Sequence, residues 1–148
     1  MKFLIGFFFL MCIISCSNDD DNNNIVDNVS INGNWKPYKY EFRGKTYMVN
    51  DCGLKGQLLI NADFTGVYER YDLSTSGNCT KFDSFAGKWG YDNLYSTLTL
   101  TYNEGGAVKT LKKEVESFST TELRVYDNSK NLDNVPGNDE AVLIFIKQ

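Results

Sequence analysis

From Trp35 to the C-terminus the chain is a succession of short β-prone segments separated by turn residues, and this pattern limits the folds open to it. No part of that region shows helical periodicity of useful length. In segment 94–102, Leu98, Leu100 and Tyr102 alternate with threonines, which is typical of a strand with one buried face. About eight to ten such segments predict an all-β fold, either an antiparallel barrel or a sandwich. Because the turns are short and sequential, an up-and-down meander is more economical than a Greek key, and we expect an antiparallel up-and-down β-barrel.

Other segments carry the same signal. Segment 35–43 places Tyr38, Tyr40 and Phe42 on one face, and Pro37 near its start indicates a bulge or an edge. The remaining expectations are a hairpin of 56–60 with 64–71, a continuation of the first strand over 45–49 beyond a kink at Gly44, turns at 92–93, 104–106 and 120–121, a loop over 127–139, and a final strand at 141–146.

The N-terminus indicates export. Lys2 precedes an apolar stretch that is shorter than the roughly 20 residues of a membrane-spanning helix. This stretch ends in Ile13-Ile14-Ser15-Cys16, which resembles the lipobox of bacterial lipoprotein signal peptides. The resemblance implies that residues 1–15 are removed and that the Cys16 thiol receives a diacylglyceryl group, which anchors the protein to a membrane. An ordinary secretory signal followed by a chance cysteine is the alternative.

The segment that follows is acidic and polar. Residues 17–24 are free of aromatics and cannot repay the entropy of ordering, so we expect residues 16–30 to be a flexible, lipidated tether. Asp19, Asp20 and Asp21 resemble the acidic signal that exports lipoproteins of Bacteroidota-type bacteria to the outer face of the outer membrane. A solvated spacer is the alternative. We expect residues 31–148 to form a single folded domain. The protein is expected to be located in the cell envelope.

Composition narrows the function classes. The formal net charge is −4, with 15 Lys+Arg against 19 Asp+Glu, so a basic surface for nucleic acid is not expected. The chain has no histidine, which excludes Ser-His-Asp and Cys-His catalysis and the usual imidazole metal sites. Phosphate-binding loops and nucleophile elbows are also missing from the sequence. We therefore expect no catalytic activity, no cofactor and no metal.

The cysteines fall into separate groups. Cys12 leaves with the signal and Cys16 is the candidate lipidation site, which leaves Cys52 and Cys79 in the exported domain. In an oxidising compartment these two thiols are expected to form a disulfide. A metal site is the alternative, although two thiolates without further spaced ligands support it weakly.

Several motifs, taken in order, resemble the lipocalin-like domain of small Bacteroidota-type lipoproteins. Gly33-Asn34-Trp35 is similar to the G-x-W motif that opens lipocalins. The motifs that follow are Cys52, the turn Asp63-Phe64-Thr65-Gly66, Cys79, the second motif Gly87-Lys88-Trp89, the Leu-rich strand 94–100 and Thr121-Glu122-Leu123. The resemblance spans about residues 31–148. It implies that Gly33 and Trp35 close one end of a barrel. It also implies a late cation that stacks on Trp35, for which Arg124 is the candidate.

The resemblance implies binding as the function. The leading hypothesis is a lipid-anchored protein outside the cytoplasm that holds a small apolar or amphipathic molecule in the barrel mouth. The alternative is a cell-envelope protein-interaction module, such as a scaffold subunit or a hydrolase inhibitor, with a barrel filled by side chains. Aromatic rings either line the site or fill the core. The candidate lining residues are Tyr38, Tyr40, Phe42, Tyr68, Trp89 and Tyr102.

Overall fold

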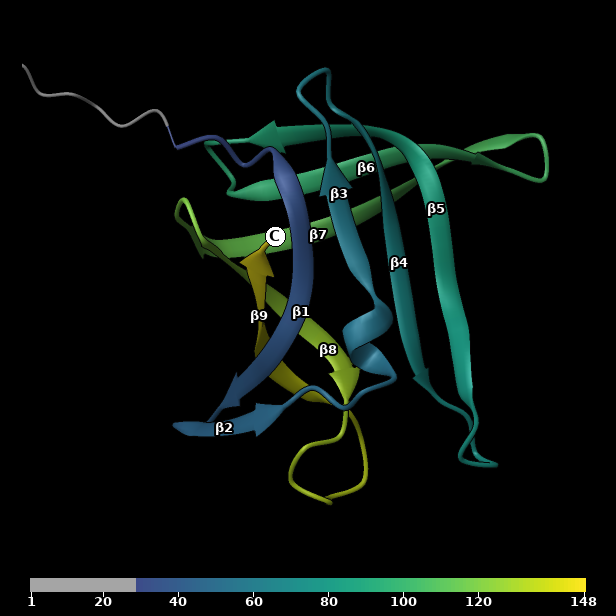
Figure 1. Ribbon diagram of the computed structural model, residues 1–148, viewed down its shortest axis with the longest axis vertical. Helices are drawn as coiled ribbons and strands as arrows, with labels where there is room; N and C mark the ends of the chain where they lie inside the picture. The colour runs from purple at the N-terminus through teal and green to yellow at the C-terminus, as the bar shows by residue number, and fades with distance from the viewer. Residues whose placement is uncertain (1–28) are drawn as a thin grey trace, which may run out of the picture.

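The computed structural model describes residues 29–148, and these form one antiparallel β-barrel (Figure 1). The strands are β1 (Gly33–Phe42), β2 (Lys45–Met48), β3 (Gln57–Ile60), β4 (Thr65–Leu73), β5 (Cys79–Asp92), β6 (Thr97–Glu104), β7 (Ala107–Phe118), β8 (Glu122–Lys130) and β9 (Asp139–Lys147), with a short 3-10 helix, η1 (Gly53–Lys55), before β3. Within the described part no helix is long and apolar enough to cross a membrane.

The sheet closes on itself. Its strand order is β2-β1-β3-β4-β5-β6-β7-β8-β9, and a further antiparallel pairing joins β1 to β9. Every strand pairs with a neighbour in sequence except where β1 meets β3 and β9, so the connections are those of an up-and-down meander. The all-β fold and the antiparallel up-and-down barrel predicted from the sequence are confirmed. So is the hairpin of β3 with β4, in which Ile60 pairs with Gly66.

The strand β2 differs from the prediction. Segment 45–49 was expected to continue the first strand, but the chain reverses at Arg43 and Gly44, which both have positive φ (48° and 72°). Residues 45–48 then pair antiparallel with the second half of β1, from Phe42 opposite Lys45 to Lys39 opposite Met48. The same edge of β1 pairs with β3 only through Gly33–Trp35. Two short strands therefore lie along this edge of β1, with β3 beside its first half and β2 beside its second half.

A bulge in β1 sets which side chains enter the barrel. The pairing of β1 with β9 shifts between Pro37 and Lys39, as Pro37 led us to expect. Trp35 and Pro37 face inward before the shift, and Tyr40 and Phe42 face inward after it. Tyr38 is the extra residue and is exposed. The prediction that Tyr38 shares a face with Tyr40 is wrong for this reason.

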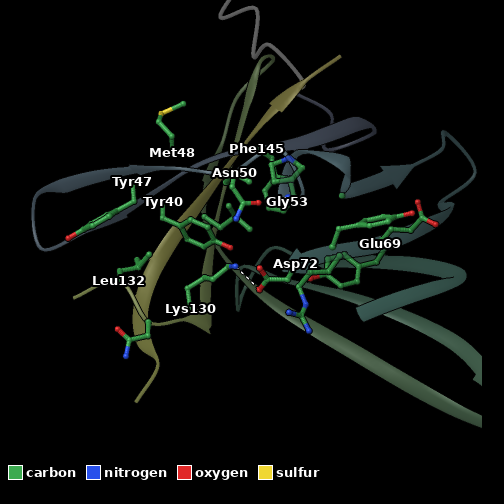
Figure 2. Close-up of a pocket in the computed structure, with 18 residues that line it drawn as sticks. Tyr40, Tyr47, Met48, Asn50, Gly53, Glu69, Asp72, Lys130, Leu132 and Phe145 are labelled. Carbon is green, nitrogen blue, oxygen red and sulfur yellow. Dashed lines mark hydrogen bonds and ion pairs between the residues drawn. The ribbon is translucent and has the colours of Figure 1, made fainter. Parts of the chain in front are cut away.

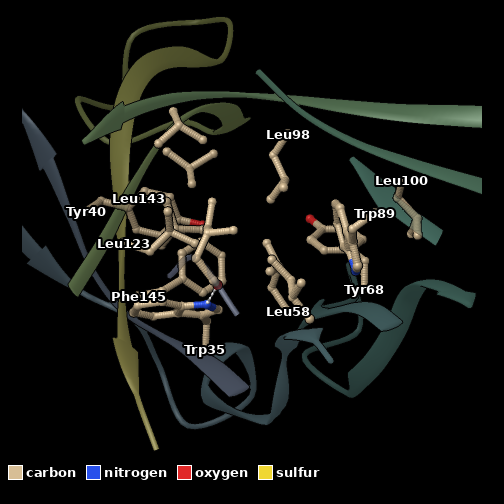
Figure 3. Packing of buried hydrophobic residues seen from close by; sticks show 14 of the residues in the cluster. Trp35, Tyr40, Leu58, Tyr68, Trp89, Leu98, Leu100, Leu123, Leu143 and Phe145 are labelled. Atoms are coloured by element: carbon tan, nitrogen blue, oxygen red, sulfur yellow. Dashed lines mark hydrogen bonds between the residues drawn. The ribbon is translucent and has the colours of Figure 1, made fainter. Parts of the chain in front are cut away.

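The core lies inside the barrel and receives buried side chains from every strand except β2. Side chains that are completely buried in it include Trp35, Leu58, Leu98, Leu100 and Leu123 (Figure 3). Leu98 and Leu100 are buried as the alternation in that segment predicted, although β6 begins only at Thr97. The strand β8 extends to Lys130, into the segment expected to be a loop, because Lys130 still pairs with Asp139 across a bulge.

Gly66 permits a close approach between strands inside the barrel wall. A Cβ on Gly66 would lie 1.8 Å from the carbonyl oxygen of Leu59 and 2.9 Å from the indole nitrogen of Trp89. That nitrogen donates a 2.9 Å hydrogen bond to the same carbonyl oxygen. The indole of Trp89 therefore lies across Gly66 on the neighbouring strand. This contact explains the glycine of the turn motif and the tryptophan of the second G-x-W motif together.

Candidate functional site

A cavity of about 260 Å³ opens at the far end of the barrel from the chain entry. It lies between the β1–β2 hairpin, the segment around η1, the end of β4 and the β8–β9 loop. Its lining residues are Pro37, Tyr40, Tyr47, Met48, Val49, Asn50, Gly53, Gly56, Tyr68, Glu69, Arg70, Tyr71, Asp72, Lys130, Asn131, Leu132, Leu143 and Phe145 (Figure 2). The volume approaches the lower end of the range of small-molecule sites, about 300–1,000 Å³.

Of the aromatic residues proposed from the sequence, Tyr40 and Tyr68 line this cavity. They extend from β1 and β4, and both are almost completely buried. Burial, and then the charge of Asp127, raise the pKa of the Tyr40 hydroxyl above its ordinary value. Burial likewise raises the pKa of Tyr68, although the ammonium of Lys113 opposes the shift. Both phenols are therefore neutral at physiological pH, and each offers a hydroxyl group at the base of the cavity.

The other proposed lining residues lie elsewhere. Phe42 and Trp89 are part of the buried core, and Tyr38 is exposed on the outer face. Tyr102 stacks on Phe85 with ring centroids 4.3 Å apart, a contact that packs β6 against β5. None of these four lines the cavity. Besides Tyr40 and Tyr68, three further rings line the cavity: Tyr47, Tyr71 and Phe145. They belong to segments whose strand register the sequence left open.

The cavity carries charges on one side. Asp72 on β4 and Lys130 at the end of β8 form an ion pair of 2.6 Å (Figure 2). Arg70, two residues before Asp72, donates through Nε to Asp83 at 2.6 Å. These pairs lie at the mouth and are partly exposed, with side-chain exposures between 20% and 30%. The site is therefore amphipathic, with tyrosine and aliphatic surface facing balanced charge.

A deeper ion pair lies beneath the mouth. The Lys113 ammonium is 3.3 Å from Oδ2 of Asp127 and 5.3 Å from the ring centroid of Tyr68. Burial alone would raise the pKa of Asp127, but Lys113 and the hydrogen bonds from Ser129 outweigh it and hold that pKa below its usual value. Burial would lower the pKa of Lys113, but Tyr68 and Asp127 outweigh it and raise that pKa. Both groups are therefore charged inside the barrel.

This interior polar set was not predicted from the sequence. Lys113 lies in a run of charged residues, and Asp127 was placed in a loop, so neither was expected inside the barrel. The available signal was the parity of β7, because Leu111, Lys113 and Val115 alternate with exposed residues. Lys113 pairs with the buried Leu98 in the β6–β7 register, and this pairing also places Lys113 on the inner face of the barrel.

Trp35 lies at the opposite, closed end. Its ring is completely buried, and its indole nitrogen donates a 2.8 Å hydrogen bond to the carbonyl oxygen of Ile31 (Figure 3). The cation over the ring is Lys147, with Nζ 4.9 Å from the centroid. A Cβ on Gly33 would lie 2.2 Å from Cε of Lys147, so the glycine of the G-x-W motif leaves room for the lysine.

Arg124, proposed from the sequence for that contact, does not make it. Its guanidinium lies outside the barrel wall and pairs with Glu41 at 2.8 Å, with Glu116 and with Glu122 at 3.5 Å. The reason is register. Trp35 pairs directly with Lys147 on β9, whereas Arg124 on β8 pairs with Ile144.

Cys52 and Cys79 form a disulfide, as predicted, which excludes the metal alternative for these two thiols. The bond joins the residue before η1 to the first residue of β5. Gly53, next to Cys52, lines the cavity. The disulfide therefore fixes one wall of the mouth. The candidate lipidation site, Cys16, and the residues expected to be signal and most of the tether lie outside the described residues.

Taken together, a closed antiparallel barrel, one end plugged by a buried tryptophan and a cavity at the other define a fold suited to binding a small molecule. The model of the lipocalin-like domain family matches residues 31–125. The chain therefore belongs to the lipocalin-like domain family, which confirms the resemblance drawn from the sequence. No curated protein and no solved structure matches the chain.

Proposed function

We propose that this protein is a non-enzymatic, lipid-anchored binding protein outside the cytoplasm that holds a small apolar or amphipathic molecule in the mouth of its barrel. The cavity is the observation that supports this proposal most directly. Five aromatic rings contribute to its wall, and Asp72 and Lys130 lie at its entrance. The alternative of an interaction module assumed a barrel filled with side chains, and an open cavity of about 260 Å³ counts against that assumption.

Competition against a fluorescent amphiphile tests ligand binding. The probe should bind to the wild-type chain and be displaced by members of a panel of fatty acids, retinoids and haem. Leu132, from the β8–β9 loop, lines the cavity, so Leu132→Trp should occupy the space and abolish probe binding. Val135→Trp is the matched control, because Val135 lies in the same loop and is 60% exposed. Equal probe binding by wild type and Leu132→Trp would rule out this cavity as the site.

The anchor is proposed from the sequence motif that ends in Cys16. Cys16→Ser should abolish metabolic labelling with a palmitate analogue and release the protein from the membrane fraction. Labelling of the variant at the wild-type level would contradict lipidation at Cys16. Surface proteolysis of intact cells then tests the location, since a protein on the outer face of the outer membrane is cleaved and one facing the periplasm is protected.

A further inference from the structure

The ion pair of Asp72 with Lys130 spans the cavity mouth. The strands β4 and β8 that carry these residues are separated by three strands on either side of the barrel, so they belong to opposite walls. Nevertheless, Nζ of Lys130 lies 2.6 Å from Oδ2 of Asp72, and both residues line the cavity. The pair is therefore a bridge between two walls rather than a contact between neighbouring strands. A ligand that enters the cavity meets this bridge first.

The charged residues that line the cavity differ in how many of their hydrogen-bonding groups already have protein partners. Both oxygens of Asp72 are already engaged, Oδ2 in the ion pair with Lys130 and Oδ1 as the acceptor of the backbone N–H of Leu73. Glu69 also accepts at both oxygens, from Gln57 at Oε2 and from Lys81 at Oε1. The acidic groups of the wall therefore have partners already.

The basic groups keep unused donors. Within residues 29–148, Lys130 contacts no acceptor other than Asp72, which leaves N–H groups of its ammonium unpaired with protein. Arg70 donates through Nε to Asp83, and its two terminal nitrogens donate to no protein atom of the described region. The side-chain charge that is available to a ligand is therefore positive, although the formal charges at the mouth balance.

The other side of the cavity is apolar. Tyr47 and Met48 from β2 and Leu132 from the β8–β9 loop lie away from Glu69 and Asp72 (Figure 2). Met48 is 61% exposed, so an apolar surface continues from the interior to the rim. A molecule with an apolar chain and a compact head group could cover both surfaces at once.

We propose that the ligand is an anionic amphiphile whose head group displaces Asp72 and binds Lys130 and Arg70, while its chain packs against Tyr47 and Leu132. This inference rests on the proposed function. The Asp72 carboxylate occupies the position of the ligand's own anionic group and is exchanged for it on binding. The head group is a carboxylate, sulfate or phosphate, since each offers the same acceptor oxygens and negative charge.

Two variants that break the same ion pair test this proposal, because they should change the affinity for an anionic amphiphile in opposite directions. Lys130→Met removes the cation that the ligand needs, so dodecanoate should bind roughly 10- to 100-fold more weakly. Asp72→Asn removes the competing carboxylate, so dodecanoate should bind roughly two- to fivefold more tightly, the factor expected for opening a partly exposed ion pair. Lys130→Arg keeps the charge and should retain most of the affinity.

Titration calorimetry on the full chain, with each amphiphile below its micelle concentration, measures these changes. Dodecyl sulfate and dodecyl phosphate distinguish among anionic head groups, and dodecanol and dodecyltrimethylammonium provide neutral and cationic probes of the same chain length. Binding of dodecanol should be nearly the same in wild type and both variants. Melting temperatures of the variants show whether the loss of the ion pair itself alters the fold.

Each other result has a distinct meaning. Weaker dodecanoate binding in both variants would make the ion pair structural and overturn the proposal. Preferred binding of the cationic probe, lost in Asp72→Asn, would overturn it in favour of a cationic ligand. Equal affinity for neutral and anionic probes would refute the anionic specificity but leave the proposed function intact. Failure of every amphiphile, together with failure of the wider panel, would refute both.

Discussion

The interior ion pair of Lys113 with Asp127 gives a prediction about stability. Asp127 is 6% exposed, and besides Lys113 it accepts hydrogen bonds only from Ser129 among residues 29–148. Removing one partner of a buried pair costs about 3–5 kcal/mol, because the other charge is left without compensation. Since Ser129 still solvates Asp127, we expect Lys113→Met to cost about 3 kcal/mol, at the lower end of that range.

Urea denaturation of the disulfide-bonded protein measures this cost. With a slope of about 2 kcal/mol per molar urea, the midpoint should fall by about 1.5 M. The double variant Lys113→Met/Asp127→Asn removes both charges, keeps an acceptor for Ser129 and should recover to within about 1 kcal/mol of wild type. Lys109→Met is the matched control on the same strand: Lys109 pairs with Glu104, both side chains are about half exposed, and the midpoint should not move.

The pH dependence follows from the lowered pKa of Asp127. A carboxyl group whose pKa falls on folding stabilises the protein above the ordinary carboxyl pKa, about 3.9, and loses that contribution as pH falls through the lowered value. The stability difference between wild type and Asp127→Asn should therefore be constant near neutrality and shrink below about pH 4. A midpoint unchanged by Lys113→Met at pH 7 would refute the reasoning, because it would mean that water already compensates Asp127.

Three further results are expected. Gly66→Ala should destabilise the domain by about 2 kcal/mol or more in urea melts, because its Cβ would overlap the Leu59 carbonyl oxygen, whereas Gly90→Ala, with no atom within 4 Å of its Cβ, should be neutral. Loss of the disulfide in Cys79→Ser should cost about 3.5 kcal/mol in the loop-entropy model for a separation of 27 residues, and both thiols of the unreduced wild type should resist alkylation. Lys147→Met should lower stability by about 0.5–2 kcal/mol through loss of the cation over Trp35; no change in the melt would show that the contact is not stabilising.

The sequence predicted the fold well because the evidence for it is local. Alternation in segments such as 97–102 and turn residues such as Gly105-Gly106 each specify one hairpin, and consecutive hairpins make a meander. Tyr38 was misplaced because the bulge in β1 adds one residue, and a shift of one residue moves a side chain to the other face. Pro37 indicated that a bulge was near, but not which residue it would expel.

The site was less predictable because it depends on contacts between distant strands. The pair of Asp72 with Lys130 joins opposite walls, and nothing in either segment indicates its partner. Arg124 and Lys147 are both late cations, and only the register of β9 against β1 selects Lys147 for Trp35. Tyr47 and Met48 line the cavity on a strand that folds back on β1, whereas a continuation of β1 past a kink at Gly44 was expected.

The polypeptide enters the barrel at its sealed end, where Ile31 meets the indole of Trp35, and β1 then runs toward the cavity (Figure 1). Any attachment through the N-terminal segment, whether to an acyl group, a fused domain or a chip, thus holds the molecule by its plugged base. Within residues 29–148, the cavity proposed to hold the ligand opens at the opposite end of the barrel from this base, so a ligand can enter and leave without passing Trp35.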